Sequence, residues 1–152
     1  MTTIKSYTDL EQSKKLSKIL PLESADMFYD GVQDLYKEKV YNIPMNGSSI
    51  TVRTGHIITE KGIKANLLLP AWSLEALLEA MPKSIPKYIE SEKCQKTFHL
   101  NLFRSYYHCC SYSFAPSISD DDGSNTLYCV GRDNWVDACY ELVLKLNELN
   151  LL

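Results

Sequence analysis

Residues 133–142 have the sequence Asp133-Asn134-Trp135-Val136-Asp137-Ala138-Cys139-Tyr140-Glu141-Leu142, and this stretch predicts a helix that runs to about Leu149. We expect Asp133 to be its N-cap, because an aspartate there can accept a hydrogen bond from a free amide of the first turn. The apolar residues that follow recur at helical spacing and form one stripe: Trp135, Cys139, Leu142, Leu146 and Leu149, with Val136 and Val143 beside them. Such a stripe is typical of a helix that packs against a core, so this stretch predicts a fold and no particular chemistry.

Two more helices are expected nearer the N-terminus, over residues 8–20 and 74–81. Thr8 is the expected N-cap of the first helix, and Glu11 would complete a capping box with it. Ser73 is the expected N-cap of the second helix. The apolar residues of that helix follow the i, i+3, i+4, i+7 rule: Leu74, Leu77, Leu78 and Met81. Both helices are therefore expected to cover a core.

A hairpin is expected in the middle of the chain. Residues 49–59 and 63–69 are rich in β-branched side chains, and Glu60-Lys61-Gly62 between them is suited to a turn. Residues 22–46 are ambiguous, because their apolar residues fit a helix that Gly31 interrupts and equally fit a helical turn followed by an irregular strand.

Further strands are expected toward the C-terminus. Residues 97–114 alternate in polarity and predict two strands, the second over residues 106–114, and residues 127–130 predict a short third strand after a polar loop. Together these elements predict an α+β fold in a single domain, residues 1–152, with a mainly antiparallel sheet and two or three helices packed on one face.

The composition is that of a soluble globular protein. The chain has 152 residues, of which 45% are hydrophobic, and a formal net charge of −3. It has no apolar run near the roughly 18 residues that a membrane span needs, and its first residues lack the apolar core of a signal peptide. We therefore expect a cytoplasmic protein that does not bind membranes. Its five cysteines are an odd number with no regular spacing, so we expect reduced thiols.

No complete catalytic, metal or phosphate motif is found in the sequence. The cysteines lack the paired spacing of a structural zinc site, and no glycine-rich run matches a nucleotide fingerprint. Asp120-Asp121-Asp122-Gly123 is similar to part of a calcium loop, but Ile118 and Cys129 stand where that loop requires its first and last carboxylates. We therefore expect no cofactor, no metal and no catalytic residue.

Three stretches together resemble a known group of proteins. They are Gln12-Ser13-Lys14-Lys15-Leu16 followed by Glu23-Ser24-Ala25-Asp26-Met27-Phe28-Tyr29, then Pro70-Ala71-Trp72-Ser73-Leu74 with Ala76-Leu77-Leu78, and finally Asp133-Asn134-Trp135-Val136-Asp137-Ala138-Cys139 with Leu146-Asn147-Glu148-Leu149. The chain resembles small uncharacterised proteins encoded in phages, prophages and other mobile elements of gut anaerobic bacteria, in which proline often stands at the position of Trp135. No activity is assigned to that family, so the resemblance implies a small accessory protein and no functional residue.

The leading hypothesis is a non-enzymatic binding protein. Its expected target is another protein, such as a host factor, or a second copy of itself as a homodimer. Tyrosine and tryptophan dominate the hot spots of protein interfaces, so the candidate interface residues are Trp72, Tyr106, Tyr107, His108 and Tyr112. Trp135 is a further candidate anchor, for which a place in the core is the favoured alternative.

Two other hypotheses remain open. A module for a nucleotide-like ligand or for nucleic acid would use the modestly basic middle of the chain, although nucleic acid usually requires a clearly basic face. A cysteine-dependent enzyme would be built on Cys109 and Cys110 with His108 or His99, since a nucleophilic thiol needs a nearby base.

Overall fold

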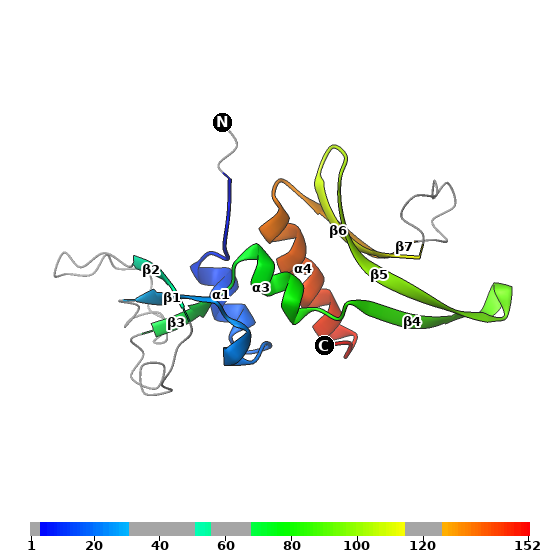
Figure 1. The fold of residues 1–152 in the computed structure, drawn as a ribbon, viewed down its shortest axis with the longest axis horizontal. Helices are drawn as coiled ribbons and strands as arrows, with labels where there is room; N and C mark the ends of the chain where they lie inside the picture. Colours follow the sequence, from blue (N-terminus) through cyan, green and yellow to red (C-terminus); the bar gives the residue numbers. More distant parts are fainter. Residues whose placement is uncertain (1–3, 31–50, 56–67, 115–125) are drawn as a thin grey trace. The chain divides into compact units, whose positions relative to one another are not determined.

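The computed structural model describes residues 4–30, 51–55, 68–114 and 126–152. Its described residues form three helices and two antiparallel sheets, which confirms the α+β class and the antiparallel pairing (Figure 1). The chain divides into two compact units, residues 6–76 and residues 1–5 with 77–152. The expectation of a single domain stays a prediction. None of the described helices is long and apolar enough to cross a membrane.

The first unit contains a three-stranded sheet in the order β2-β1-β3. Its strands are β1 (Met27–Asp30), β2 (Thr51–Thr54) and β3 (Leu68–Ala71). The predicted hairpin is wrong in its described part, residues 51–54 and 68–69, because β1 lies between β2 and β3 and pairs with both. The short β1 falls in the region where the sequence pattern was ambiguous, and the expected turn at residues 60–62 lies outside the described residues.

The first helix, α1 (Leu10–Leu16), packs on β3 and is shorter than expected. Its N-cap is Asp9, which forms a capping box with Gln12, so the expected cap at Thr8 is wrong by one residue. Thr8 is buried instead, and its hydroxyl oxygen lies 2.8 Å from the hydroxyl oxygen of Ser13. The buried contact draws Thr8 away from the cap position, and Asp9 can reach the amide of Gln12 in its place.

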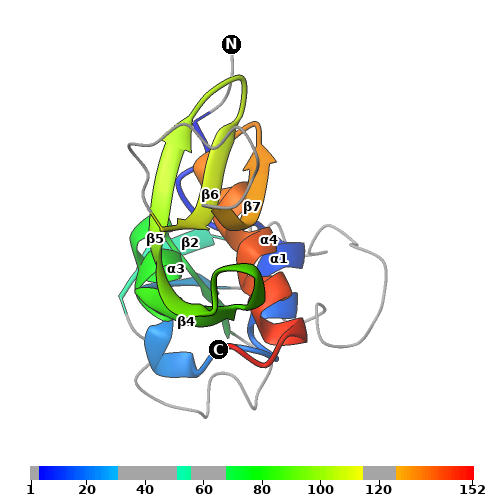
Figure 2. The ribbon, with the colours of Figure 1, turned by 90° about the vertical axis from the view of Figure 1, so that its right-hand side faces the viewer.

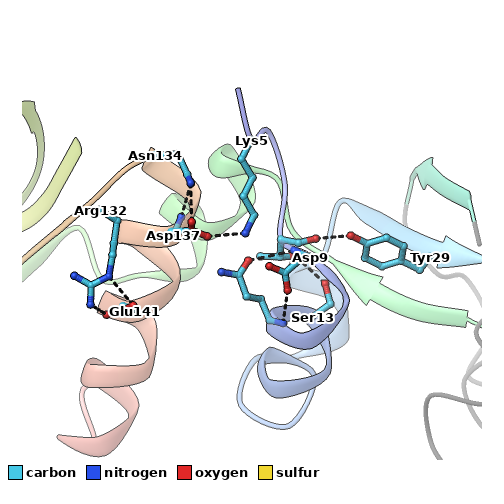
Figure 3. A network of polar contacts seen from close by, with 10 residues as sticks. Lys5, Asp9, Ser13, Tyr29, Arg132, Asn134, Asp137 and Glu141 are labelled. Carbon is cyan, nitrogen blue, oxygen red and sulfur yellow. Dashed lines mark hydrogen bonds and ion pairs between the residues drawn. The ribbon is translucent and has the colours of Figure 1, made fainter. Parts of the chain in front are cut away.

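The core of the first unit combines apolar packing with buried hydrogen bonds. Tyr29, Leu69 and Ala71 form its centre, and the hydroxyl of Tyr29 donates to the carbonyl oxygen of Thr8 at 2.7 Å, on the right of Figure 3. After β3, Trp72 is fully buried, and its indole NH donates to the hydroxyl of Ser24 at 2.9 Å. Ser24 ends the short 3-10 helix η1 (Leu22–Ser24). Residues far apart in the sequence thus fix one another.

The helix α3 (Leu74–Ala80) begins after β3. The hydroxyl of Ser73 accepts a hydrogen bond from the amide of Ala76 at 3.2 Å, which confirms Ser73 as its cap. Ser73 is itself held by Asp26, since its amide donates to one carboxylate oxygen of Asp26 at 2.9 Å and its hydroxyl donates to the other. The start of α3 is therefore tied to the residue that precedes β1.

The second unit contains a four-stranded sheet in the order β4-β5-β6-β7. Its strands are β4 (Ser84–Ile89), β5 (Cys94–Arg104), β6 (His108–Ser113) and β7 (Thr126–Arg132), and η3 (Glu90–Glu92) joins the first two. The sequence pattern did not predict β4, which contains Pro86 and lies at an edge of the sheet, the place in a sheet where proline is tolerated. Residues 94–98 of β5 pair only with β4 and form a two-stranded ribbon. His99 pairs with both neighbours, and residues 100–104 pair with β6.

The last helix, α4 (Trp135–Glu148), packs on β6 and β7 (Figure 2). Its N-cap is Asn134 and not the expected Asp133: the side chain of Asn134 accepts from the amide of Asp137 at 2.8 Å. The carboxylate of Asp137 also lies 2.6 Å from the ammonium of Lys5, as the left half of Figure 3 shows. The predicted stripe is confirmed in its middle, where Cys139, Leu142 and Leu146 are fully buried.

Candidate functional site

The turn between β5 and β6 carries the largest exposed aromatic group of the second unit. Tyr106 is 101% exposed, Tyr107 56% and Phe103 40%. The turn is closed by a hydrogen bond of 3.0 Å from the amide of Ser105 to the carbonyl of Tyr107, and it lies at the top of the sheet in Figure 2. Arg104 is also exposed. We call Phe103, Arg104, Tyr106 and Tyr107 the hairpin surface.

A glycine on the neighbouring strand allows Tyr107 to lie close to the sheet. A Cβ atom at Gly131 would meet the Cβ of Tyr107 at 3.2 Å and the sulfur of Cys109 at 3.3 Å. The thiol of Cys109 also donates to the carbonyl of Tyr107 at 3.7 Å. Phe103 lies opposite Cys109, which lies opposite Gly131, so the register places Phe103 on the same face. Tyr107 is therefore held close to the sheet, and Phe103 shares its face.

The other face of the same hairpin carries basic residues. Arg104 lies opposite His108, and His108 lies opposite Arg132, so the three stand in one row across β5, β6 and β7. The ring of His108 meets that of Trp135 edge to face, with 4.7 Å between centroids and 75° between planes. Arg132 pairs with both carboxylate oxygens of Glu141, with one donor distance of 2.7 Å (Figure 3). These contacts tie His108 and Arg132 to α4 at the end of the sheet that carries the turn.

The five candidate interface residues differ in their exposure to solvent. Tyr106 and Tyr107 are exposed as the hypothesis requires, and His108 is half-buried against α4. Trp72 and Tyr112 are wrong as exposed anchors, because both are fully buried. Tyr112 donates from its hydroxyl to the carbonyl of Pro82 at 2.7 Å, and burial raises its pKa above that of a free tyrosine.

Three residues outside this set also differ from the expectation. Trp135 was expected in the core, but it is only half-buried, at the first residue of α4. Phe103 and Arg104 belong to the surface, although sequence reasoning did not select them. A usable signal was their position just before a tight turn, since the last residues of a strand are covered less than its middle.

Four of the five thiols form two pairs on opposite faces of the second sheet. The thiol of Cys110 interacts with that of Cys139 on α4, and this hydrogen bond together with burial raises the pKa of Cys110 well above its usual value. On the other face, burial and the neighbouring Cys109 raise the pKa of Cys129. All five cysteines are free. Raised pKa values disfavour the thiolate, which is the nucleophilic form.

The histidines do not stand where a cysteine nucleophile would need them. His108 and Cys109 are successive strand residues and therefore point to opposite faces of the sheet. Cys110 shares a face with His108 but is fully buried, and the ring of His108 packs on Trp135. His99 is exposed on β5. Among the described residues, no three histidine, cysteine, aspartate or glutamate side chains are grouped to hold a metal, and the acidic run 120–122 lies outside those residues.

Thiol labelling of the native chain is expected to separate these cysteines. Cys129 is exposed and should react with a maleimide, whereas Cys110 and Cys139 are fully buried and should react only after unfolding. Because the pKa of Cys129 is raised, its labelling rate should continue to rise above the ordinary thiol pKa of about 8.5. Peptide mass spectrometry identifies the labelled positions, and Cys129→Ser is the control. Rapid native labelling of Cys110 or Cys139 would contradict the packing of α4 on β6.

Comparison with known proteins identifies no relative of the chain. No protein-family model matches the chain, and no curated protein or solved structure does. The resemblance to proteins of mobile elements accordingly stays a prediction.

Proposed function

We propose that the chain acts in the cytoplasm by binding another protein, and that it does so through the hairpin surface. The observation that carries the proposal is the exposure of three aromatic side chains at the end of a single hairpin: Phe103, Tyr106 and Tyr107. Exposed aromatic residues are enriched at protein interfaces, and tyrosine and arginine are over-represented among the residues that dominate binding energy.

Rigidity supports the same proposal. A binding surface that is already ordered loses less conformational freedom when a partner docks. The close approach of Tyr107 to Gly131 and the packing of His108 on Trp135 both fix the hairpin from within the unit. The aromatic side chains are thus presented by a tight turn and the strand end beside it, and not by a long loop.

The resemblance to proteins of phages and mobile elements suggests the class of partner. Such a protein would bind a factor of its host cell, and a second copy of the chain is the other candidate that the hypothesis allows. The partner is therefore to be sought in extracts of the cells that naturally carry the protein.

The experiment is a tagged pull-down with quantitative mass spectrometry, after nuclease treatment. The wild-type chain should retain one protein in stoichiometric amount, and combined replacement of Phe103, Tyr106 and Tyr107 by Ala should remove it. Each true hot spot should contribute about 2 kcal/mol, or roughly 30-fold in Kd. All three residues are exposed, so circular dichroism and thermal unfolding should change little.

The matched control is Tyr88→Ala. Tyr88 is 57% exposed, nearly the same as Tyr107, but lies on β4. The Tyr88→Ala variant should retain the partner at the wild-type level. Equal loss of the partner with Tyr88→Ala, or full retention by the triple variant, would refute the hairpin surface as the binding surface.

A further inference from the structure

We infer that Arg104 binds a carboxylate of the partner, so that the hairpin surface recognises an acidic peptide segment with apolar side chains. This inference rests on the proposed function and adds the chemistry of the partner. It is carried by the row Arg104–His108–Arg132, in which three basic side chains occupy directly opposite positions on adjacent strands.

A guanidinium group keeps its charge in proteins and binds most strongly to an anionic oxygen. The chain supplies that anion at one end of the row only. Glu141 on α4 neutralises Arg132 through a two-point contact. No carboxylate of the described residues pairs with Arg104, which lies at the other end of the row and is exposed.

The surroundings of Arg104 favour a peptide that is both acidic and apolar. A guanidinium group binds a carboxylate through two parallel hydrogen bonds, which fixes the direction of the partner. Tyr106, two residues further on, is fully exposed, and Phe103 is 40% exposed on the other face of the strand. The partner segment would therefore place a carboxylate at Arg104 and an apolar side chain against Tyr106.

The direct test is selection from a random peptide library displayed on particles, with the purified full chain as bait. Peptides retained by the wild-type chain should be enriched in Asp and Glu next to apolar residues, relative to the unselected library. One enriched peptide is then synthesised, together with a version in which Gln and Asn replace its acidic residues. Binding of both to each variant is measured by fluorescence anisotropy.

The decisive variant is Arg104→Glu, and Lys87→Glu is its matched control. Lys87 is exposed on β4, and its replacement makes the same change in net charge away from the hairpin. Arg104→Glu should lower the affinity for the acidic peptide by about tenfold or more. The wild-type chain should bind the neutral peptide with an affinity reduced by a similar factor. Lys87→Glu should change the affinity by less than about twofold, because exposed charges away from the contact contribute little.

The outcomes separate this inference from the proposed function. If alanine at Phe103 and Tyr106 abolishes peptide binding but Arg104→Glu does not, or if the selected peptides are not acidic, the inference is overturned and the proposed function stands. If the aromatic variants retain every selected peptide, the proposed function itself fails. Tighter binding of a single-stranded oligothymidylate than of any peptide, or sedimentation as a dimer that Arg104→Glu leaves intact, would also overturn the acidic-peptide inference.

Discussion

Replacing Trp72 with Ala is expected to lower the free energy of unfolding by about 3–5 kcal/mol, the range measured when a large buried aromatic residue is truncated. Trp72 is fully buried at the end of β3, where a cavity of this size has no solvent to fill it. Its backbone amide also donates to the buried hydroxyl of Thr8 at 3.1 Å, so collapse of the site would disturb the contact that places α1. Denaturant unfolding followed by circular dichroism measures the change.

Trp72→Phe provides the control for packing. It keeps most of the buried ring and removes the hydrogen bond from the indole to Ser24, so it should lower the free energy of unfolding by about 1 kcal/mol more than the lost volume alone. Ser24 keeps its hydroxyl bond to the carbonyl of Pro21 at 2.6 Å. An unfolding midpoint for Trp72→Ala equal to that of the wild type would show that the indole is not packed as described.

Tyr112→Ala is expected to lower the free energy of unfolding by a similar amount, about 3–5 kcal/mol, whereas Tyr107→Ala should change it by about 0.5 kcal/mol or less. Both are tyrosines within six positions of one another, but Tyr112 is fully buried and Tyr107 is 56% exposed. Binding should respond in the opposite way, since Tyr107 belongs to the hairpin surface. Chemical denaturation of both variants, with the pull-down as second readout, tests this reversal.

Tyr112→Phe isolates the hydroxyl group. It removes the bond to Pro82 and should lower the free energy of unfolding by about 1 kcal/mol. Because the pKa of Tyr112 is raised in the folded chain, its contribution to stability is complete below the ordinary tyrosine pKa of about 10 and is lost as the pH rises above it. Tyr112→Phe should therefore lose less stability than the wild type between neutral and strongly alkaline pH. An identical pH dependence would contradict the buried environment of the hydroxyl.

Helices were the elements that the sequence predicted best. The spacing of Leu142 and Leu146 requires a helical period, and the structure buries both. The caps were less certain because neighbouring residues compete: Asp133 and Asn134 can both cap a helix, and the backbone brings only the second within reach of the amide of Asp137. A one-residue choice of this kind depends on the approach of the preceding strand.

The burial of single aromatic residues could not be predicted, because it depends on distant parts of the chain. The indole of Trp72 binds a residue 48 positions away, and the hydroxyl of Tyr112 binds one 30 positions away. No local pattern contains such partners. Strand β4 could not be predicted for a related reason. Its residues Pro86, Lys87 and Tyr88 are exposed and show no strand pattern, and they form a strand because β5 lies beside them.

The ribbon formed by β4 and the first half of β5 offers a site for attaching a label away from the hairpin surface. Its tip, η3, precedes β5, and the hairpin surface lies at the other end of the same 11-residue strand. At about 3.3 Å per residue, the strand separates the two ends by roughly 35 Å. A fluorophore or an affinity tag attached at the exposed Ser91 would stand clear of anything docked on Tyr106. Immobilising the chain by this tip would present the aromatic turn to solution in a defined orientation.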